Sequence, residues 1–135
     1  MSKSNPNESS YILLIDGPEV IRKKISRAVT DSESIVRYDW IAKPAVSNLI
    51  EIYAVCSGDA VADIEKRYEG MGYGTFKQDL ADVIIQKIVP IQEKYREIVD
   101  SAELIRILRE GAAKATETAN ETLVNVKKAM GLVTF

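Results

Sequence analysis

Apolar residues recur at steps of three and four along residues 76–98, and this stripe constrains the fold more than any other feature of the chain. Its members are Phe76, Leu80, Ile84, Ile88, Ile91, Tyr95 and Ile98. Because an α-helix turns once every ~3.6 residues, they fall on one side of a helix, and we expect that side to be buried. Thr75 and Gln78 form a capping-box pattern that predicts the start of this helix. Pro90 interrupts the stripe and is expected to kink the helix.

Further segments carry helix signals and are joined by short connections: residues 17–29, 43–57, 60–68 and 101–130. The first two open with a proline in the first turn, Pro18 and Pro44, which is a favoured helix start. Gly58 is suited to end the second segment, because glycine readily adopts the left-handed backbone conformation. Asp100 or Ser101 is expected to cap the last helix.

Apolar residues on these segments again follow helical spacing. We expect the first three segments to bury Val20, Ile21, Ile25, Ala28 and Val29; Val46, Leu49, Ile50, Tyr53 and Ala54; and Val61, Ile64 and Tyr68. The last segment places Leu104, Leu108, Ala115, Ala119, Leu123, Val126 and Met130 on one face. Residues 11–15 are a short apolar run, either a strand or the lead-in to a helix. The prediction is an all-α bundle of about five helices with a polar N-terminal loop.

Composition excludes several kinds of chemistry within this chain. It has 135 residues, a net charge of −2, one cysteine and no histidine, which describes one ordinary soluble domain in a reducing compartment. Zinc binding by Cys and His, and nucleophilic catalysis by Ser-His or Cys-His pairs, lack their residues. The sequence shows no signal peptide and no apolar run long enough to span a membrane. As an enzyme on its own, the chain is poorly equipped.

Three motifs have a functional and a structural interpretation. The glycine-rich stretch 69–74 lacks a preceding strand and the lysine of a phosphate-binding loop, so a tight helix–helix connection is favoured. The cations Arg22, Lys23, Lys24 and Arg27 lie opposite the apolar face of their helix, where a solvated side is favoured over an RNA-backbone contact. Most aromatic residues stand at core positions, which favours packing over base stacking.

The N-terminal residues could bind an anion. Ser2, Lys3 and Ser4 provide two hydroxyls and an ammonium on a polar stretch, followed by the turn-forming residues 5–7. Taken alone, such a stretch is more often a frayed terminus.

The whole chain resembles the C-terminal portion of the bacterial-type tryptophanyl-tRNA synthetases, which are class I aminoacyl-tRNA synthetases. Met1-Ser2-Lys3-Ser4 is similar to the last four residues of the class I signature loop Lys-Met-Ser-Lys-Ser. Further blocks typical of the family follow in order at residues 21–32, 37–39, 43–49, 68–74, 90–95, 110–112 and 130–132. The related tyrosyl enzymes share the loop but not these later blocks.

The resemblance implies a role for the first residues. In this family the signature loop closes over ATP and steadies the pyrophosphate leaving group, so Met1, Ser2, Lys3 and Ser4 are expected to bind ATP. Lys3 is expected to be catalytic, by stabilising the transition state and the pyrophosphate. The first lysine of the motif, the Rossmann domain, the histidine-containing ATP motif and the tryptophan pocket do not occur in these residues. We therefore expect a fragment that begins inside the active-site loop and is inactive by itself.

The resemblance also implies an organisation and partners. Residues 1–16 would form the phosphate loop and its apolar lead-in, and residues 17–135 the helical domain that engages the tRNA anticodon region. The parent enzyme is expected to use ATP with magnesium, to bind tryptophan tRNA, to carry an N-terminal Rossmann domain, to form a homodimer and to be cytoplasmic. Neither a protein-bound metal nor a tightly bound cofactor is expected on this chain, and no membrane contact. Arg22, Lys23, Lys24 and Arg27 are the candidate tRNA contacts.

Two other readings of the isolated chain stay open. It could be a non-catalytic helical module that binds RNA through its basic cluster. It could also be a structural domain whose former contact surfaces are exposed as apolar patches, for which residues 11–15 are the candidate.

Overall fold

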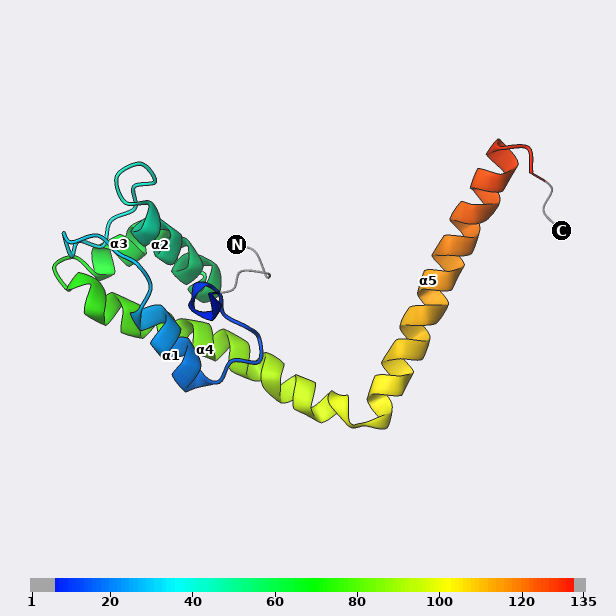
Figure 1. The fold of residues 1–135 in the computed structure, drawn as a ribbon, viewed down its shortest axis with the longest axis horizontal. Helices are drawn as coiled ribbons and strands as arrows, with labels where there is room; N and C mark the ends of the chain where they lie inside the picture. The colour runs from blue at the N-terminus through cyan, green and yellow to red at the C-terminus, as the bar shows by residue number, and fades with distance from the viewer. Residues whose placement is uncertain (1–6, 133–135) are drawn as a thin grey trace. The chain divides into compact units, whose positions relative to one another are not determined.

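The computed structural model describes residues 7–132, and every regular element in that range is helical (Figure 1). A short 3₁₀ turn, η1 (Glu8–Ser10), precedes five α-helices: α1 (Pro18–Ser26), α2 (Pro44–Ser57), α3 (Val61–Arg67), α4 (Gly72–Val99) and α5 (Ala102–Ala129). The prediction of an all-α chain with five helices is confirmed. The run at residues 11–15 is not a strand; it leads through a turn towards α1, which is the second of the two alternatives.

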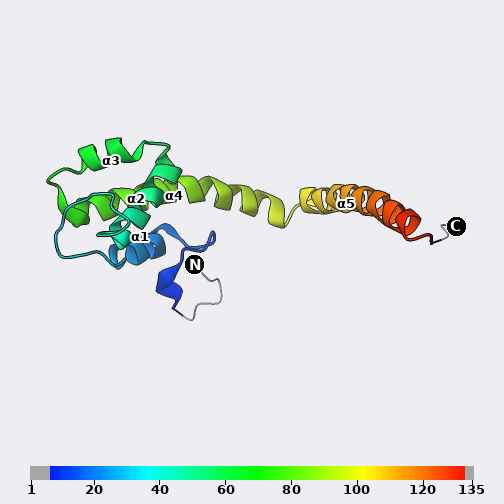
Figure 2. The same cartoon turned by 90° about the horizontal axis from the view of Figure 1, so that it is seen from above.

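The chain divides into two compact units, Met1–Gln92 and Glu93–Phe135, and α4 continues from the first into the second. The buried core lies in the first unit, where α1, α2 and α3 gather around the N-terminal half of α4 (Figures 1 and 2). Its fully buried large side chains are Ile21, Val46, Ile50, Ile64, Tyr68, Phe76 and Leu80. These residues come from all four helices and the turn after α3, so one apolar cluster holds the unit together.

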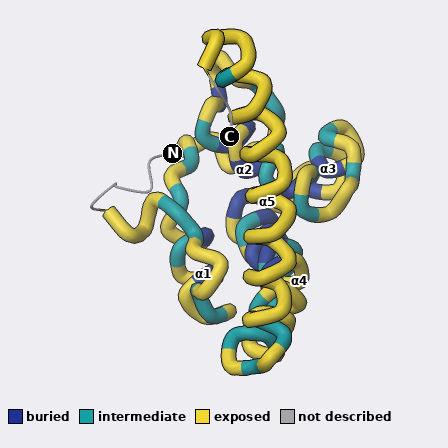
Figure 3. The backbone as a smooth tube through the Cα atoms, turned by 90° about the vertical axis from the view of Figure 1, so that its right-hand side faces the viewer, coloured by how far each residue is buried: buried dark blue, intermediate teal, exposed yellow. Residues whose placement is uncertain are grey.

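The second unit has a different character. No residue of α5 is buried, and Figure 3 shows this helix exposed along nearly all of its length. Its apolar face, which we define as Leu108, Leu123, Val126 and Met130, is exposed. On the polar side Arg106 pairs with Glu103 at 2.5 Å and with Glu110 at 2.6 Å, at the spacings that stabilise an isolated helix.

Several helix boundaries follow local rules. Pro18 and Pro44 are the first residues of α1 and α2, as predicted, because proline needs no hydrogen-bond partner there. Gly58 ends α2 at φ +85°, a left-handed conformation in which its N–H bonds the carbonyl of Ala54 at 2.8 Å. Ser101 is the N-cap of α5, although its side chain makes no capping hydrogen bond.

The predicted start of α4 is wrong. The helix begins at Gly72 and not at Thr75, so part of the glycine-rich stretch is helical. Gly72 adopts φ +72°, which turns the chain sharply as the helix begins. Tyr73 is then placed in the first turn with its ring buried, and this burial favours the earlier start.

The predicted burial is wrong at some helix ends. Residues 73–88 of α4 contribute to the core, but Ile91 and Tyr95, further along the same stripe, are exposed. Val20, in the first turn of α1, is also exposed, and so is Val29, which lies beyond the end of α1 at Ser26. Periodicity identifies the side of a helix that can be buried, whereas burial also needs a neighbouring element to cover that side.

Candidate functional site

The four residues predicted to bind ATP, Met1, Ser2, Lys3 and Ser4, lie outside the described residues. The described chain begins at Asn7, which starts the turn η1. Its side-chain oxygen accepts the N–H of Ser9 at 3.0 Å, and its carbonyl accepts the hydroxyl of Ser10 at 2.8 Å. Asn7 thus makes the local hydrogen bonds expected of a turn-forming residue.

The segment that follows is tied to α1 and α4. The Asp16 carboxylate accepts the N–H of Leu13 at 2.9 Å and the ammonium of Lys24 at 2.7 Å. Gln92 donates its amide to the carbonyls of Leu14 and Asp16, both at 2.8 Å. Burial by itself raises the pKa of Asp16, but the hydrogen bonds from Lys24 and Leu13 lower the pKa to below its ordinary value. The end of this segment therefore has a defined attachment, although its side chains at residues 13–15 are exposed.

The predicted basic cluster on α1 separates into two pairs. Arg22 forms an ion pair with Asp82 on α4, and Lys24 is the largely buried partner of Asp16. Lys23 and Arg27 are exposed and form no ion pair within residues 7–132. Of the four cations, these two are available to a ligand without first breaking an ion pair.

The groove between α1 and α4 is lined by both positively and negatively charged side chains. Its cations are Arg22, Lys23 and Lys77, and its carboxylates are Glu19, Asp79 and Asp82. The Lys77 ammonium is already bound, to the carbonyl of Ala28 at 2.7 Å and to the hydroxyl of Thr30 at 3.2 Å. A polyanion would meet mixed charge in this groove, so it does not have the uniformly basic lining of a phosphate-binding groove.

An ion cluster around the buried Lys43, which the sequence did not predict, joins the loop before α2 to α4. The side chain of Lys43 is only 2% exposed, and its ammonium lies 3.0 Å from Asp31, 2.7 Å from Glu33 and 3.2 Å from the hydroxyl of Tyr73. The Tyr73 hydroxyl donates to Asp31 at 2.7 Å. The sequence marked Lys43 only as a helix start, because its partners lie at separations of up to 30 residues.

Hydrogen bonding fixes the charge state of this cluster. The bond from Tyr73, followed by that from Lys43, lowers the pKa of Asp31 to about 2. Burial lowers the pKa of Lys43, but its bonds to Glu33 and Asp31 outweigh this and raise the pKa above its ordinary value. An ammonium that holds its proton this firmly is unsuited to proton transfer, so the cluster is a structural clamp.

A second buried network links α2, α3 and α4. Arg67 donates to the hydroxyl of Tyr53 at 3.1 Å, the hydroxyls of Tyr53 and Tyr68 are 3.0 Å apart, and Tyr68 lies 2.8 Å from the Asp79 carboxylate. Because a carboxylate only accepts, Tyr68 donates to Asp79 and accepts from Tyr53. Their rings and that of Phe76 pack together, with centroids 5.2–6.0 Å apart. These tyrosines are core residues, as predicted.

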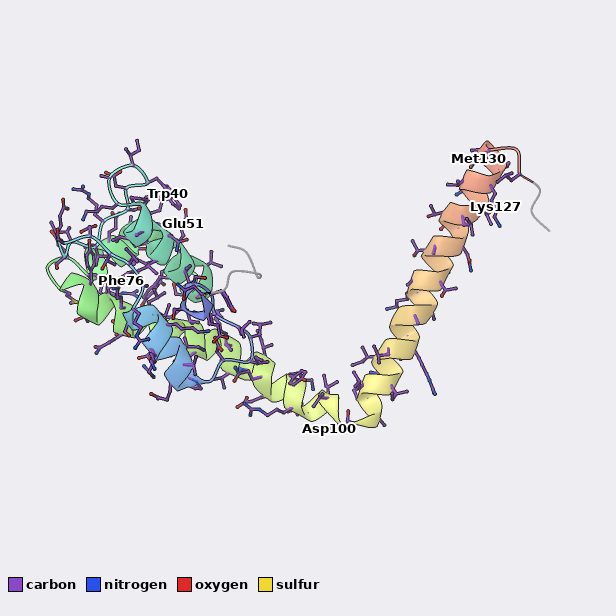
Figure 4. The ribbon with its side chains drawn as sticks, viewed as in Figure 1. Trp40, Glu51, Phe76, Asp100, Lys127 and Met130 are labelled. Carbon is purple, nitrogen blue, oxygen red and sulfur yellow. The ribbon has the colours of Figure 1, made fainter. Side chains whose placement is uncertain are left out.

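The only tryptophan is half exposed on the loop before α2. Trp40 donates its indole N–H to the hydroxyl of Tyr38 at 2.6 Å, and Tyr38 donates to Glu51 on α2 at 2.8 Å. Figure 4 labels Trp40 on the loop before α2, Glu51 within α2 and Phe76 on α4. The ring is positioned by hydrogen bonds, which sequence reasoning did not predict.

Residues 7–132 contain neither a metal-ligand cluster nor a membrane-spanning helix. No group of three or more His, Cys, Asp or Glu side chains in this range is arranged to hold a metal ion. No helix in the described part of the chain is both long and apolar enough to cross a membrane.

Comparison with known proteins identifies the class to which this helical chain belongs. The family described as tRNA synthetases class I (W and Y) matches residues 1–88, which is more than half of the chain and includes the predicted ATP loop. The chain therefore belongs to the class I tRNA synthetase family for tryptophan and tyrosine.

Individual relatives are named more narrowly, as tryptophan–tRNA ligases. That of Bacillus subtilis (strain 168) is 51% identical over 132 residues, and that of Bacillus anthracis is 53% identical over 132 residues. Each alignment covers 98% of this chain and 40% of the relative, so the chain spans about two fifths of their length. The crystal structure of tryptophanyl-tRNA synthetase from Mycoplasma pneumoniae matches with a TM-score of 0.87 and 29% identity, over 98% of this chain and 41% of that one.

Proposed function

We propose that the chain is the C-terminal part of a tryptophan–tRNA ligase, an enzyme that activates tryptophan with ATP and transfers it to its tRNA. The observation that carries this proposal is the identity of 51–53% to tryptophan–tRNA ligases across 132 residues. A resemblance confined to the short signature loop would not indicate which amino acid the enzyme activates. The observed identity extends through the helical region as well.

Within that enzyme, residues 1–16 supply the ATP loop and its lead-in. The donor set of Ser2, Lys3 and Ser4 fits a polyphosphate, because it combines two hydroxyls with an ammonium. When bound, ATP supplies the activated phosphorus that the tryptophan carboxylate attacks, with pyrophosphate as the leaving group. Lys3 stabilises the negative charge that develops on that leaving group. Magnesium fits the same site through the phosphates, since it binds phosphate oxygens with few protein ligands.

Residues 17–135 supply the helical part that engages the tRNA. Lys23 and Arg27 are its leading phosphate contacts, because both are exposed and form no ion pair within the described range. Arg22 and Lys24 are secondary candidates, since an RNA phosphate would have to compete with Asp82 and Asp16. The other proposed partners are a Rossmann domain that completes the active site and a second subunit in a cytoplasmic homodimer.

The activity itself can be tested by tryptophan-dependent exchange of pyrophosphate into ATP. We expect no exchange with this chain alone, because it spans only 40% of the length of the ligases that it resembles. We expect exchange when the separately produced Rossmann half is added. Lack of exchange in the mixture, with both parts shown to be folded, would contradict the proposal.

Lys3 can be tested in an enzyme that carries this sequence together with the Rossmann half. Replacing Lys3→Gln should lower the exchange rate by roughly 10²- to 10³-fold, the usual loss on removing one group that stabilises developing charge. Tryptophan binding should change little, because Lys3 acts on the phosphates. Lys23→Gln removes an equal charge outside the loop and is the matched control. An unchanged exchange rate in Lys3→Gln would exclude the assigned role.

A further inference from the structure

A pocket opens in the first compact unit, and its lining residues come from segment 7–12, from helices α1, α2 and α4, and from the turn after α1. Its volume is about 530 Å³, which is within the range of small-molecule sites. The base is made by buried side chains of three helices: Ile25, Leu49, Ile84 and Ile88. A ligand there would therefore remove apolar surface from water.

The charges around this pocket are all of one sign. Its seventeen lining residues include the cations Lys24, Arg27 and Lys87 and no carboxylate, although acidic residues outnumber basic ones by 20 to 18 in the whole chain. The charge of Lys24 is balanced by Asp16, which is not part of the lining. Arg27 and Lys87 are exposed and form no ion pair among the described residues. Their two charges are left at the rim of an apolar hollow.

We propose that this pocket binds a single amphipathic monoanion, a carboxylate whose apolar body fills the base and whose charge is held by Arg27 and Lys87. Apolar burial provides most of the affinity, and the two cations select an anion over a neutral molecule of the same shape. The site is separate from the ATP loop and from the α1–α4 groove. The proposal does not depend on the proposed ligase activity, because it rests on residues 7–88 of this chain alone.

Cys56 provides a built-in reporter. It is the only cysteine of the chain, it lines the pocket, and it is partly exposed. The test measures the rate at which the neutral reagent N-ethylmaleimide modifies Cys56 in the 135-residue chain, with decanoate or decanol as the probe. We expect both probes to slow modification. Decanoate should half-protect Cys56 at a roughly three- to tenfold lower concentration than decanol, the effect expected of two exposed ion pairs.

Variants separate the apolar and the charged contributions. Val29 lies on the rim with 78% of its surface exposed, so Val29→Trp can obstruct the pocket without disturbing the core, and it should abolish protection by both probes. The double change Arg27→Gln and Lys87→Gln should leave protection by decanol unchanged and remove the preference for decanoate. Lys23→Gln is the matched control, because Lys23 is exposed on α1 but does not line the pocket. The Lys23→Gln variant should still be protected by decanoate at a lower concentration than by decanol.

Three results would overturn the proposal. The first is full reactivity of Cys56 at saturating decanoate. The second is protection by decanoate that is as strong in the Val29→Trp variant as in the unchanged chain, because the probe would then bind elsewhere. The third is protection that rises with protein concentration when no probe is present, because a second copy of the chain would then be the occupant.

Discussion

The hydrogen-bond chain from Arg67 to Asp79 allows a sharp test of what holds the first unit together. Tyr68 is 1% exposed and stands in the middle of this chain, donating to Asp79 and accepting from Tyr53. Tyr68→Phe removes one oxygen and keeps the ring that packs against Phe76. The change therefore isolates the two hydrogen bonds from the apolar packing.

The magnitude follows from what each partner loses. A hydrogen bond to a charged group contributes about 1.5–3 kcal/mol, and one between neutral groups about 1 kcal/mol. Asp79 is only partly buried, so water replaces some of its loss, whereas Tyr53 is 4% exposed and keeps only its bond from Arg67. We expect the free energy of unfolding to fall by about 2 kcal/mol. At roughly 4–8 °C per kcal/mol for a unit of this size, Tm should fall by roughly 8–16 °C.

Urea unfolding followed by circular dichroism measures this loss directly. Tyr95→Phe is the matched control, because it also removes one hydroxyl but from a side chain that is 58% exposed, and it should change stability by less than ~0.5 kcal/mol. In a double-mutant cycle, Asp79→Asn should cost less in the Tyr68→Phe background than in the unchanged chain. Equal stability of Tyr68→Phe and Tyr95→Phe would refute the argument that the buried network stabilises the fold.

Other predictions address pH, RNA binding and association. Folding stability should decrease as pH falls from about 4 to about 2. The pKa of Asp31 is lowered from 3.8 to about 2, chiefly by the hydrogen bond from Tyr73, and Asp31 stabilises the fold only while it is ionised. Urea unfolding across this range should show the decrease, and Asp31→Asn should flatten it. In the parent enzyme, the double variant Lys23→Glu and Arg27→Glu should weaken tRNA binding. The slope of log K against log salt concentration, measured by filter binding, should become shallower by about one for each phosphate that is no longer neutralised. Unchanged affinity would mean that the two cations only face solvent. The isolated chain should self-associate at high concentration through the exposed apolar face of α5, and Leu123→Glu should reverse this in sedimentation experiments; a monomer at all concentrations would contradict it.

Local rules predicted much of the fold. The apolar periodicity located every helix, and the starts at Pro18 and Pro44 and the end at Gly58 needed only knowledge of proline and glycine. Predictions failed where a distant partner decides the outcome. Gly72 begins α4 because Tyr73 enters the core, and Ile91 remains exposed although it continues a regular stripe.

The candidate site was less predictable for the same reason. The sequence placed four cations on one side of α1, but it could not show that Arg22 pairs with Asp82, sixty positions away. It also gave no sign that Lys43 is enclosed by Asp31, Glu33 and Tyr73. Sequence spacing predicts which side of a helix a charged residue lies on. Its ion-pair partner depends on which helices pack together, and the spacing does not show this.

The burial of Lys43 within its ion cluster has a consequence for modification of the chain. An acyltransferase must reach a lysine amine, and in the folded unit this one is 2% exposed and bound to two carboxylates. An acetyl group placed on Lys43 during synthesis would remove the charge that Asp31 and Glu33 balance, leaving both carboxylates beside a neutral amide at the foot of α2. Folding should therefore protect Lys43 from acylation, and acetylation of Lys43 before folding should destabilise the folded unit.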